Sequence, residues 1–140
     1  MKNKDSHQTA YLLLRVAVGV NFIGHGLVRF PKIAGFREWM LEEFEGSMLP
    51  DFLVSPFATV LPFAEFAVGL LLLLGLFTYR VAIAGAVIII LLIFGSCLIE
   101  NWSAVGSQMV YVLLFYFLIA EVGNDGFGLD EKRGAGLGTG

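Results

Sequence analysis

The sequence predicts an all-α integral membrane protein, a four-helix bundle in which successive helices run up and down. Of the 140 residues, 57% are hydrophobic and 15% are charged, with a mean hydropathy of +0.80. A soluble domain is expected to be about 45–50% apolar and about 25% charged. The charges also crowd into residues 1–5, 29–51 and 121–133. The stretches between them have room for four helices of about 20 residues, the length that crosses a bilayer.

Four apolar runs follow a short polar N-terminal tail, residues 1–10. The runs cover residues 11–30, 56–77, 81–99 and 104–122, and they make one membrane domain, residues 11–122. Because lipid offers backbone groups no hydrogen-bond partners, we expect each run to be helical. The links between the second, third and fourth runs are only three or four residues long. Links that short predict antiparallel neighbours.

Two segments lie outside the spans. Residues 33–52 are predicted to hold a short amphipathic helix, because Ile33, Phe36, Met40 and Phe44 recur at helical spacing while glutamates occupy other positions. This helix could be a solvated connector, cover a site or receive a partner. Residues 123–140 are rich in glycine, and we expect a flexible tail there.

The cations predict the orientation. The N-terminal tail, the link at residues 78–80 and the C-terminal tail share one face and carry five Lys and Arg residues, whereas the other face carries Arg29, Lys32 and Arg37. Short loops rich in Lys and Arg stay in the cytoplasm. Both termini are therefore expected in the cytoplasm, and the link between the first two spans outside.

Polar side chains inside the spans are candidate functional residues, because burial in lipid is costly unless they are paired or face water. At about 1.5 Å of rise per residue, His25 and Glu65 differ by only about 6 Å in depth, in the outer half of the bilayer. The predicted outer cluster comprises Asn21, His25, Arg29, Glu65, Glu100, Asn101 and Gln108. Arg15 and Glu121 lie near the inner ends of their helices and are predicted to form a pair.

An imidazole beside a buried carboxylate can donate and accept protons. We therefore expect His25 and Glu65 to be the catalytic pair, and the other five members of the outer cluster to bind the ligand. The set suits a quinone head group, whose reduction needs hydrogen-bond donors and a route for protons. A structural alternative is that His25 and Glu65 only satisfy one another and lock the bundle.

Neither haem nor a metal is expected from one chain. His7 and His25 are the two histidines, and about 27 Å of helix separates them. His25 and Glu65 together provide fewer ligands than the three or four usual for zinc. The single cysteine, Cys97, can form neither an internal disulfide nor a dithiol pair.

The motifs resemble those of a known family. The segment RVAVGVNFIGHGLVRFPK, followed by PFAEFAVGLLLLLGLFTYR, is similar to the DoxX family of small membrane proteins, and the closing GFGLDEK is similar to its final motif. The resemblance extends from about residue 10 to 131. It implies a four-helix protein of the bacterial inner membrane, and it implies Arg15, His25 and Glu65 as site positions.

The same resemblance implies a redox function. Relatives of the DoxD type form the membrane subunit of a thiosulfate:quinone oxidoreductase, and other relatives act with soluble redox proteins under oxidative stress. This chain has neither an additional soluble domain nor a second cysteine. Sulfur chemistry would therefore need a partner subunit.

Three functions fit these features. The first is a redox-associated membrane subunit that binds a quinone or a similar small molecule near His25 and Glu65. The second is a non-enzymatic membrane anchor that holds a soluble redox protein through Trp39 and Phe44. The third is a small transporter, which would need the inner pair to open and the chain to form a homo-oligomer. The expected partners are the lipid bilayer and these proteins. No nucleic-acid partner is expected.

Overall fold

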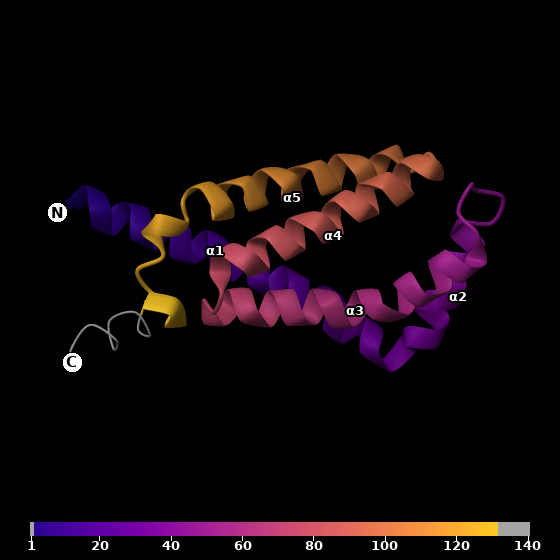
Figure 1. The fold of residues 1–140 in the computed structure, drawn as a ribbon, viewed down its shortest axis with the longest axis horizontal. Coiled ribbons are helices and arrows are strands. Elements are labelled where there is room, and N and C mark those ends of the chain that lie inside the picture. The colour runs from indigo at the N-terminus through magenta and orange to yellow at the C-terminus, as the bar shows by residue number, and fades with distance from the viewer. Residues whose placement is uncertain (1, 132–140) are drawn as a thin grey trace.

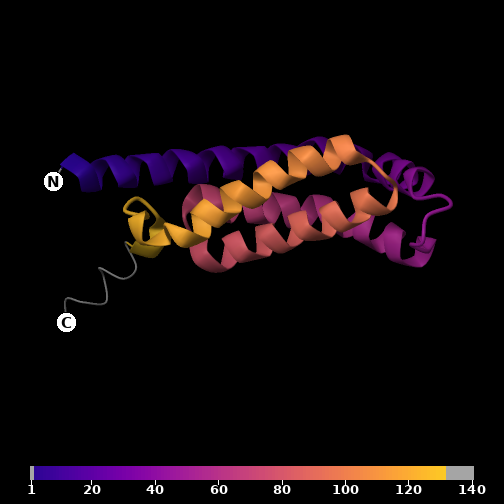
Figure 2. The same ribbon diagram turned by 90° about the horizontal axis from the view of Figure 1, so that it is seen from above.

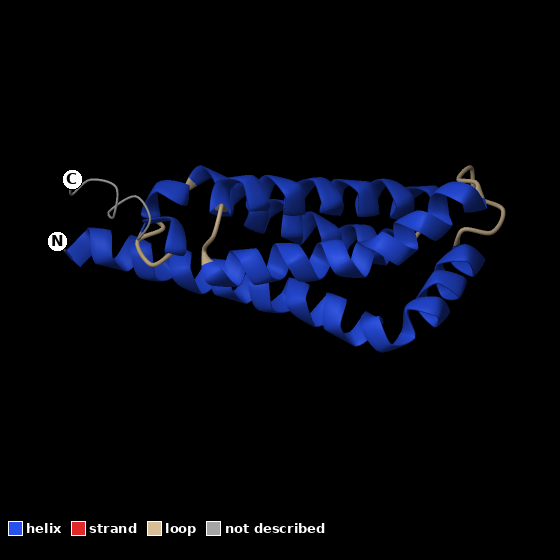
Figure 3. Cartoon of the chain, turned by 60° about the horizontal axis from the view of Figure 1, so that its bottom comes forward, coloured by secondary structure: helices blue, strands red, loops and turns tan. Residues whose placement is uncertain are grey.

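The computed structural model describes residues 2–131, and all their regular structure is helical (Figure 3). The helices are α1 (Lys2–Arg29), α2 (Ile33–Glu43), α3 (Asp51–Leu74), α4 (Thr78–Leu98) and α5 (Trp102–Ala120), with short 3-10 turns η1 (Phe30–Lys32) and η2 (Val122–Asn124). Four helical segments, which contain α1, α3, α4 and α5, are long and apolar enough to cross a membrane. The predicted four-helix membrane bundle is confirmed, and the chain is a multi-pass membrane protein.

All four spanning helices begin before the predicted spans, and the difference is largest for α1 and α3. Helix α1 starts at Lys2, so the polar N-terminal residues continue the first helix instead of forming a separate tail. Helix α3 starts at Asp51, five residues before the predicted span. Pro50 has an extended backbone at its N-cap, and Asp51 places a carboxylate in the first turn, where the helix dipole favours negative charge.

Both described ends of the chain lie at one end of the bundle, and α2 lies at the other (Figure 1). We call these the termini end and the α2 end. Helices α3 and α4 meet at the termini end through a tight turn, in which Gly75 and Phe77 both have positive φ. From that turn α3 and α4 diverge toward the α2 end (Figure 1).

Glycines bring α1 and α3 into backbone contact. A Cβ added to Gly69 of α3 would lie 2.5 Å from the Ile23 backbone nitrogen, and one added to Gly26 of α1 would lie 2.7 Å from the Pro62 carbonyl oxygen. Small residues allow membrane helices to approach closely where lipid provides no hydrophobic driving force between them. Helices α1 and α3 therefore form one closely packed wall of the bundle.

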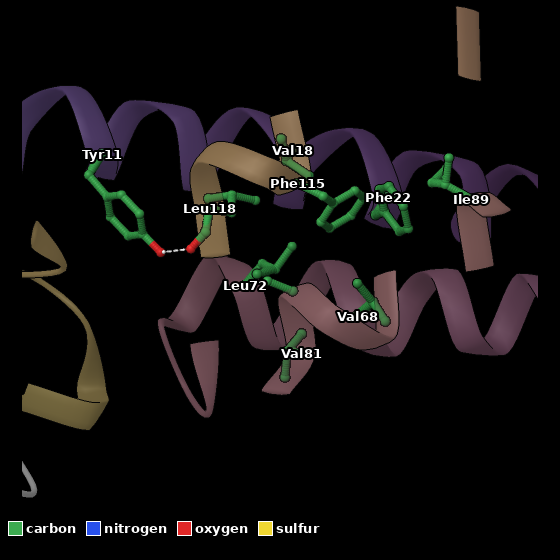
Figure 4. Packing of buried hydrophobic residues seen from close by; sticks show 10 residues of the cluster. Tyr11, Val18, Phe22, Val68, Leu72, Val81, Ile89, Phe115 and Leu118 are labelled. Carbon is green, nitrogen blue, oxygen red and sulfur yellow. Dashed lines mark hydrogen bonds between the residues drawn. The ribbon is translucent and has the colours of Figure 1, made fainter. Parts of the chain in front are cut away.

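The apolar core fills the half of the bundle nearer the termini end. Phe115 of α5 packs edge-on against Phe22 of α1, with ring centroids 5.4 Å apart, and its ring also lies over Gly85 of α4. Leu72 and Leu118 are fully buried beside it (Figure 4). Helix α5, which crosses α1 when seen from above (Figure 2), is thereby fixed to the wall formed by α1 and α3.

The predicted amphipathic helix is present as α2 and covers the α2 end. Met40 and Phe44 are buried against Val54 and Ala58 of α3, whereas the glutamates of α2 are exposed. The Phe44 ring reaches across to Gly95 of α4, 3.1 Å from the position of an added Cβ. The helix is shorter than the predicted segment, because residues 44–50 form turns before α3 begins.

A matched pair of glycine substitutions tests the contact between α1 and α3. Gly69→Ala forces a methyl group into the Ile23 backbone, and overpacking of this kind costs about 1–3 kcal/mol. Gly24→Ala is the control, because its added methyl meets no atom within 4 Å. Thermal unfolding in detergent should show a lower midpoint for Gly69→Ala and an unchanged or higher one for Gly24→Ala. Equal midpoints would contradict the proposed packing.

Candidate functional site

A cavity of about 490 Å³ lies at the α2 end, between the diverging helices and beneath α2. Its volume falls in the range of about 300–1,000 Å³ that is typical of small-molecule sites. All five α-helices contribute to the lining. The cavity follows from the fold, because α3 and α4 separate toward this end and α2 covers the space only in part.

Six of the seven residues of the predicted outer cluster line this cavity. They are Asn21, His25, Arg29, Glu65, Asn101 and Gln108. The seventh, Glu100, does not line it: it has a φ of 56° in the turn between α4 and α5, and its side chain is exposed. The next residue, Asn101, caps α5 by accepting a hydrogen bond from the Ala104 backbone nitrogen at 3.1 Å. This capped turn directs Glu100 away from the site.

Glu65 is paired with Arg29. The Glu65 carboxylate is buried, and its Oε2 accepts a hydrogen bond from Nη1 of Arg29 within an ion pair. The guanidinium carbon also lies 4.5 Å from the centre of the Phe36 ring, a cation–π contact. From the sequence, a pair between His25 and Glu65 was one of the expected arrangements. The structure assigns the carboxylate to Arg29 instead, which leaves the imidazole available.

His25 presents one ring nitrogen for a ligand. Its Nδ1 lies 2.9 Å from the backbone carbonyl oxygen of Asn21. A carbonyl only accepts hydrogen bonds, so Nδ1 carries the hydrogen and Nε2 carries the lone pair of the neutral ring. Nε2 can therefore accept a hydrogen bond from a ligand hydroxyl or, once protonated, donate one to a ligand carbonyl.

Tyr111 and Ser96 join the site without having been predicted. The Tyr111 hydroxyl donates to Asn21 Oδ1 at 2.8 Å, which ties α5 to α1. Gln108 Nε2 donates to Ser96 Oγ at 3.0 Å, and within residues 2–131 the buried Oε1 of Gln108 has no hydrogen-bond partner. Tyr111 lies three residues after Gln108 on α5. That helical spacing is the sequence signal that could have identified it.

Aromatic rings form much of the remaining lining. Phe36 and Trp39 of α2 stack with centroids 5.9 Å apart, and Phe44, Phe57 and Phe94 also face the cavity. The apolar face of α2 was predicted, and covering a site was one of the three roles left open for this helix. The site thus combines convergent polar groups with flat apolar walls. In the described chain no three His, Cys, Asp or Glu side chains converge as metal ligands would.

Arg15 lies at the termini end, and its predicted pairing is wrong. The residue is 1% exposed, its Nη1 donates to the Leu72 carbonyl at 2.8 Å, and its Nε lies 3.4 Å from Asp125 Oδ1. Glu121, the predicted partner, accepts a hydrogen bond from Asn124 and is exposed. The chain reverses through η2 after α5, and this reversal carries Asp125 over the buried guanidinium.

The segment after α5 is ordered by contacts with the bundle. Asp125 Oδ2 accepts a hydrogen bond from the Thr78 hydroxyl at 2.9 Å, and Asp130 Oδ2 accepts one from the Thr78 backbone nitrogen at 3.0 Å. The backbone nitrogen of Asp130 donates to the Gly75 carbonyl. The prediction of a flexible tail is therefore wrong for residues 123–131. Residues 132–140 of that expected tail lie outside the described residues.

The chain matches the model of a known protein family. The model of the DoxX family matches residues 10–96, which is more than half of the chain. The matched segment contains Arg15, His25 and Glu65 and ends at Ser96, before Gln108 and Tyr111. No curated protein and no solved structure matches the chain.

The Arg15 contacts predict a strong effect on stability. Asp125→Ala leaves a buried guanidinium without its carboxylate, a loss that costs about 3–5 kcal/mol. Glu121→Ala removes an exposed carboxylate and should change the free energy of unfolding by about 0.5 kcal/mol or less. Denaturant unfolding in detergent micelles measures both variants. If Glu121→Ala were as destabilising as Asp125→Ala, the assigned pairing would be wrong.

Proposed function

This chain belongs to the DoxX family, and we propose that it is a redox-associated membrane subunit that binds a quinone head group in the cavity at the α2 end. The observation that carries the proposal is the arrangement of the lining. His25, the Arg29–Glu65 pair and Gln108 converge on a space whose other walls are aromatic and aliphatic. A flat ring with two oxygens at opposite edges matches these polar and apolar parts.

The polar groups can serve both redox forms of such a ligand. A quinone carbonyl needs a donor, and Arg29 uses one of its five N–H groups for Glu65. A hydroquinone hydroxyl needs an acceptor, which His25 Nε2 provides. The site can therefore retain the ring while it gains or loses protons.

The proposed reaction needs an external donor for its two electrons. Reduction of a quinone to a hydroquinone consumes two electrons and two protons. The electrons come from a soluble redox protein or a second subunit, since the lone Cys97 offers no dithiol. His25 first takes a proton from water at Nε2, and the imidazolium passes it to the near oxygen of the ring and returns to the neutral form. The second proton also comes from water, and the Glu65 carboxylate, held by Arg29, is a second group that can accept a proton and pass it on.

The cations on the connecting segments support a location and an orientation. The positive-inside rule favours both termini in the cytoplasm. The cavity then lies in the outer half of the bilayer, and α2 lies at the outer surface. We place the protein in the bacterial inner membrane, where the quinone pool is dissolved. A soluble electron donor would approach over α2.

The two other functions draw less support from the structure. An anchor that holds a partner through Trp39 and Phe44 would use both side chains, but Phe44 is buried against α3 and α4 and only Trp39 is half-exposed. A transporter would need the termini end to open. Contacts of Asp125 with Arg15 and Thr78 hold that end closed.

Binding can be followed through Trp39, which lines the cavity. In a Trp102→Phe background Trp39 is the single tryptophan, and a bound quinone should quench its fluorescence. His25→Phe removes a hydrogen bond to a charged or polar partner, worth about 1.5–3 kcal/mol, so quinone affinity should fall about 10- to 100-fold. The titration uses a short-chain quinone with the protein in lipid nanodiscs.

The second histidine provides a matched control for this titration. His7 lies on the same helix, is exposed, and is separated from His25 by about 27 Å. His7→Phe should leave the quenching curve unchanged. Saturable quenching that survives His25→Phe, or the absence of any saturable quenching, would overturn the proposal.

A further inference from the structure

The cavity reaches the protein surface between α3 and α4. Four apolar residues form this rim, which we call the α3–α4 portal: Leu53 and Phe57 of α3, and Leu91 and Phe94 of α4. All four line the cavity, yet Leu53 and Leu91 are each 49% exposed and Phe94 is 57% exposed. Side chains that line a cavity and are also exposed mark its mouth. The portal lies on two helices that are long and apolar enough to cross a membrane, so we expect it to face lipid.

Contacts close the cavity between α1 and α3 and toward the termini end, whereas the exposed lining residues Trp39, Glu43 and Asn101 mark a second mouth beside α2. Gly26 of α1 touches the backbone of α3, so no chain can pass between these two helices. The Tyr111–Asn21 hydrogen bond joins α5 to α1, and the Gln108–Ser96 hydrogen bond joins α5 to α4. Toward the termini end, the packed core around Phe22 and Phe115 blocks the path.

Polarity changes from the inside of the cavity to the portal. His25 and Arg29 lie on α1 and Gln108 lies on α5, and Glu65 meets Arg29 on the side where α3 contacts α1. The portal itself is formed by leucine and phenylalanine side chains alone. A molecule that fits both regions must have a polar head and an apolar chain. Its chain must also be at lower energy in hydrocarbon than in water.

From this arrangement we propose that the α3–α4 portal takes the isoprenoid tail of a quinone, which enters sideways from the bilayer while its head group lies beside His25. This inference rests on the proposed function and adds the route of entry. The tail passes between Phe57 and Phe94 and continues into lipid. The portal is therefore an entrance for ligands that are already dissolved in the membrane.

Two photoreactive probes test the route in nanodiscs that contain the full chain. One probe is a benzoquinone with a diazirine on the ring, and the other carries the diazirine on the second isoprene unit of its tail. Peptide mapping after illumination should find the ring probe on the segment around His25. It should find the tail probe on the segments that contain Leu53 and Phe57 or Leu91 and Phe94. Excess unlabelled long-chain quinone should abolish both signals.

A substitution at the rim gives a matched comparison. Leu91→Trp narrows the portal and should reduce specific tail labelling about tenfold, the scale of an overpacking penalty. Ile90→Trp is the control, because Ile90 is the neighbouring residue, is 56% exposed and does not line the cavity. Ring labelling by a probe without a tail should persist in both variants, which shows that both still fold.

The labelling results distinguish failure of the portal from failure of quinone binding. Ring labelling at His25 together with tail labelling on α1 or α5 would overturn the portal and leave quinone binding intact. Tail labelling that is equal in Leu91→Trp and Ile90→Trp would also overturn the portal. Absence of displaceable ring labelling near His25 would overturn quinone binding itself, and the portal with it.

Discussion

The close contact between α1 and α3 is the constraint on which the rest of the structure depends. Gly26 and Gly69 let the two backbones touch along the middle of the bundle. That contact brings Arg29 of α1 to Glu65 of α3 at the α2 end, and Arg15 of α1 to the Leu72 carbonyl at the other end. Because α1 and α3 form a single wall, the α4–α5 hairpin can diverge from it, and the cavity opens in the space between.

The two arginines of α1 have different surroundings. Arg15 is enclosed by a carbonyl group and Asp125, and it joins the C-terminal segment to the bundle. Arg29 borders the cavity and lies over an aromatic ring, with further N–H groups besides the one donated to Glu65. A buried ion pair contributes little net stability compared with apolar packing of similar volume. The Arg29 side chain is also the more exposed of the two, at 23% against 2% for Arg15.

The sequence was sufficient for the spans and for most of the site. Unbroken apolar runs gave the four helices, and the rise per residue placed His25 and Glu65 at similar depths. The sequence did not predict that Asp125 is the partner of Arg15, because the path of the chain after α5 depends on η2 and on the contacts of Thr78. Glu100 was assigned to the site because depth alone does not show that a left-handed turn directs its side chain outward. The aromatic wall depends on how α2 docks, which periodicity does not determine.

If a quinone oxygen meets Nε2 of His25, as proposed, nitrogen NMR of this side chain will detect the contact. A His7→Gln variant labelled with ¹⁵N at its remaining histidine reports on His25 alone. Without ligand, the spectrum should show a protonated Nδ1 and an unprotonated Nε2. Addition of a quinone or its hydroquinone should shift the Nε2 resonance and leave Nδ1 bonded to the Asn21 carbonyl. An Nε2 resonance that does not respond to either form would contradict the account.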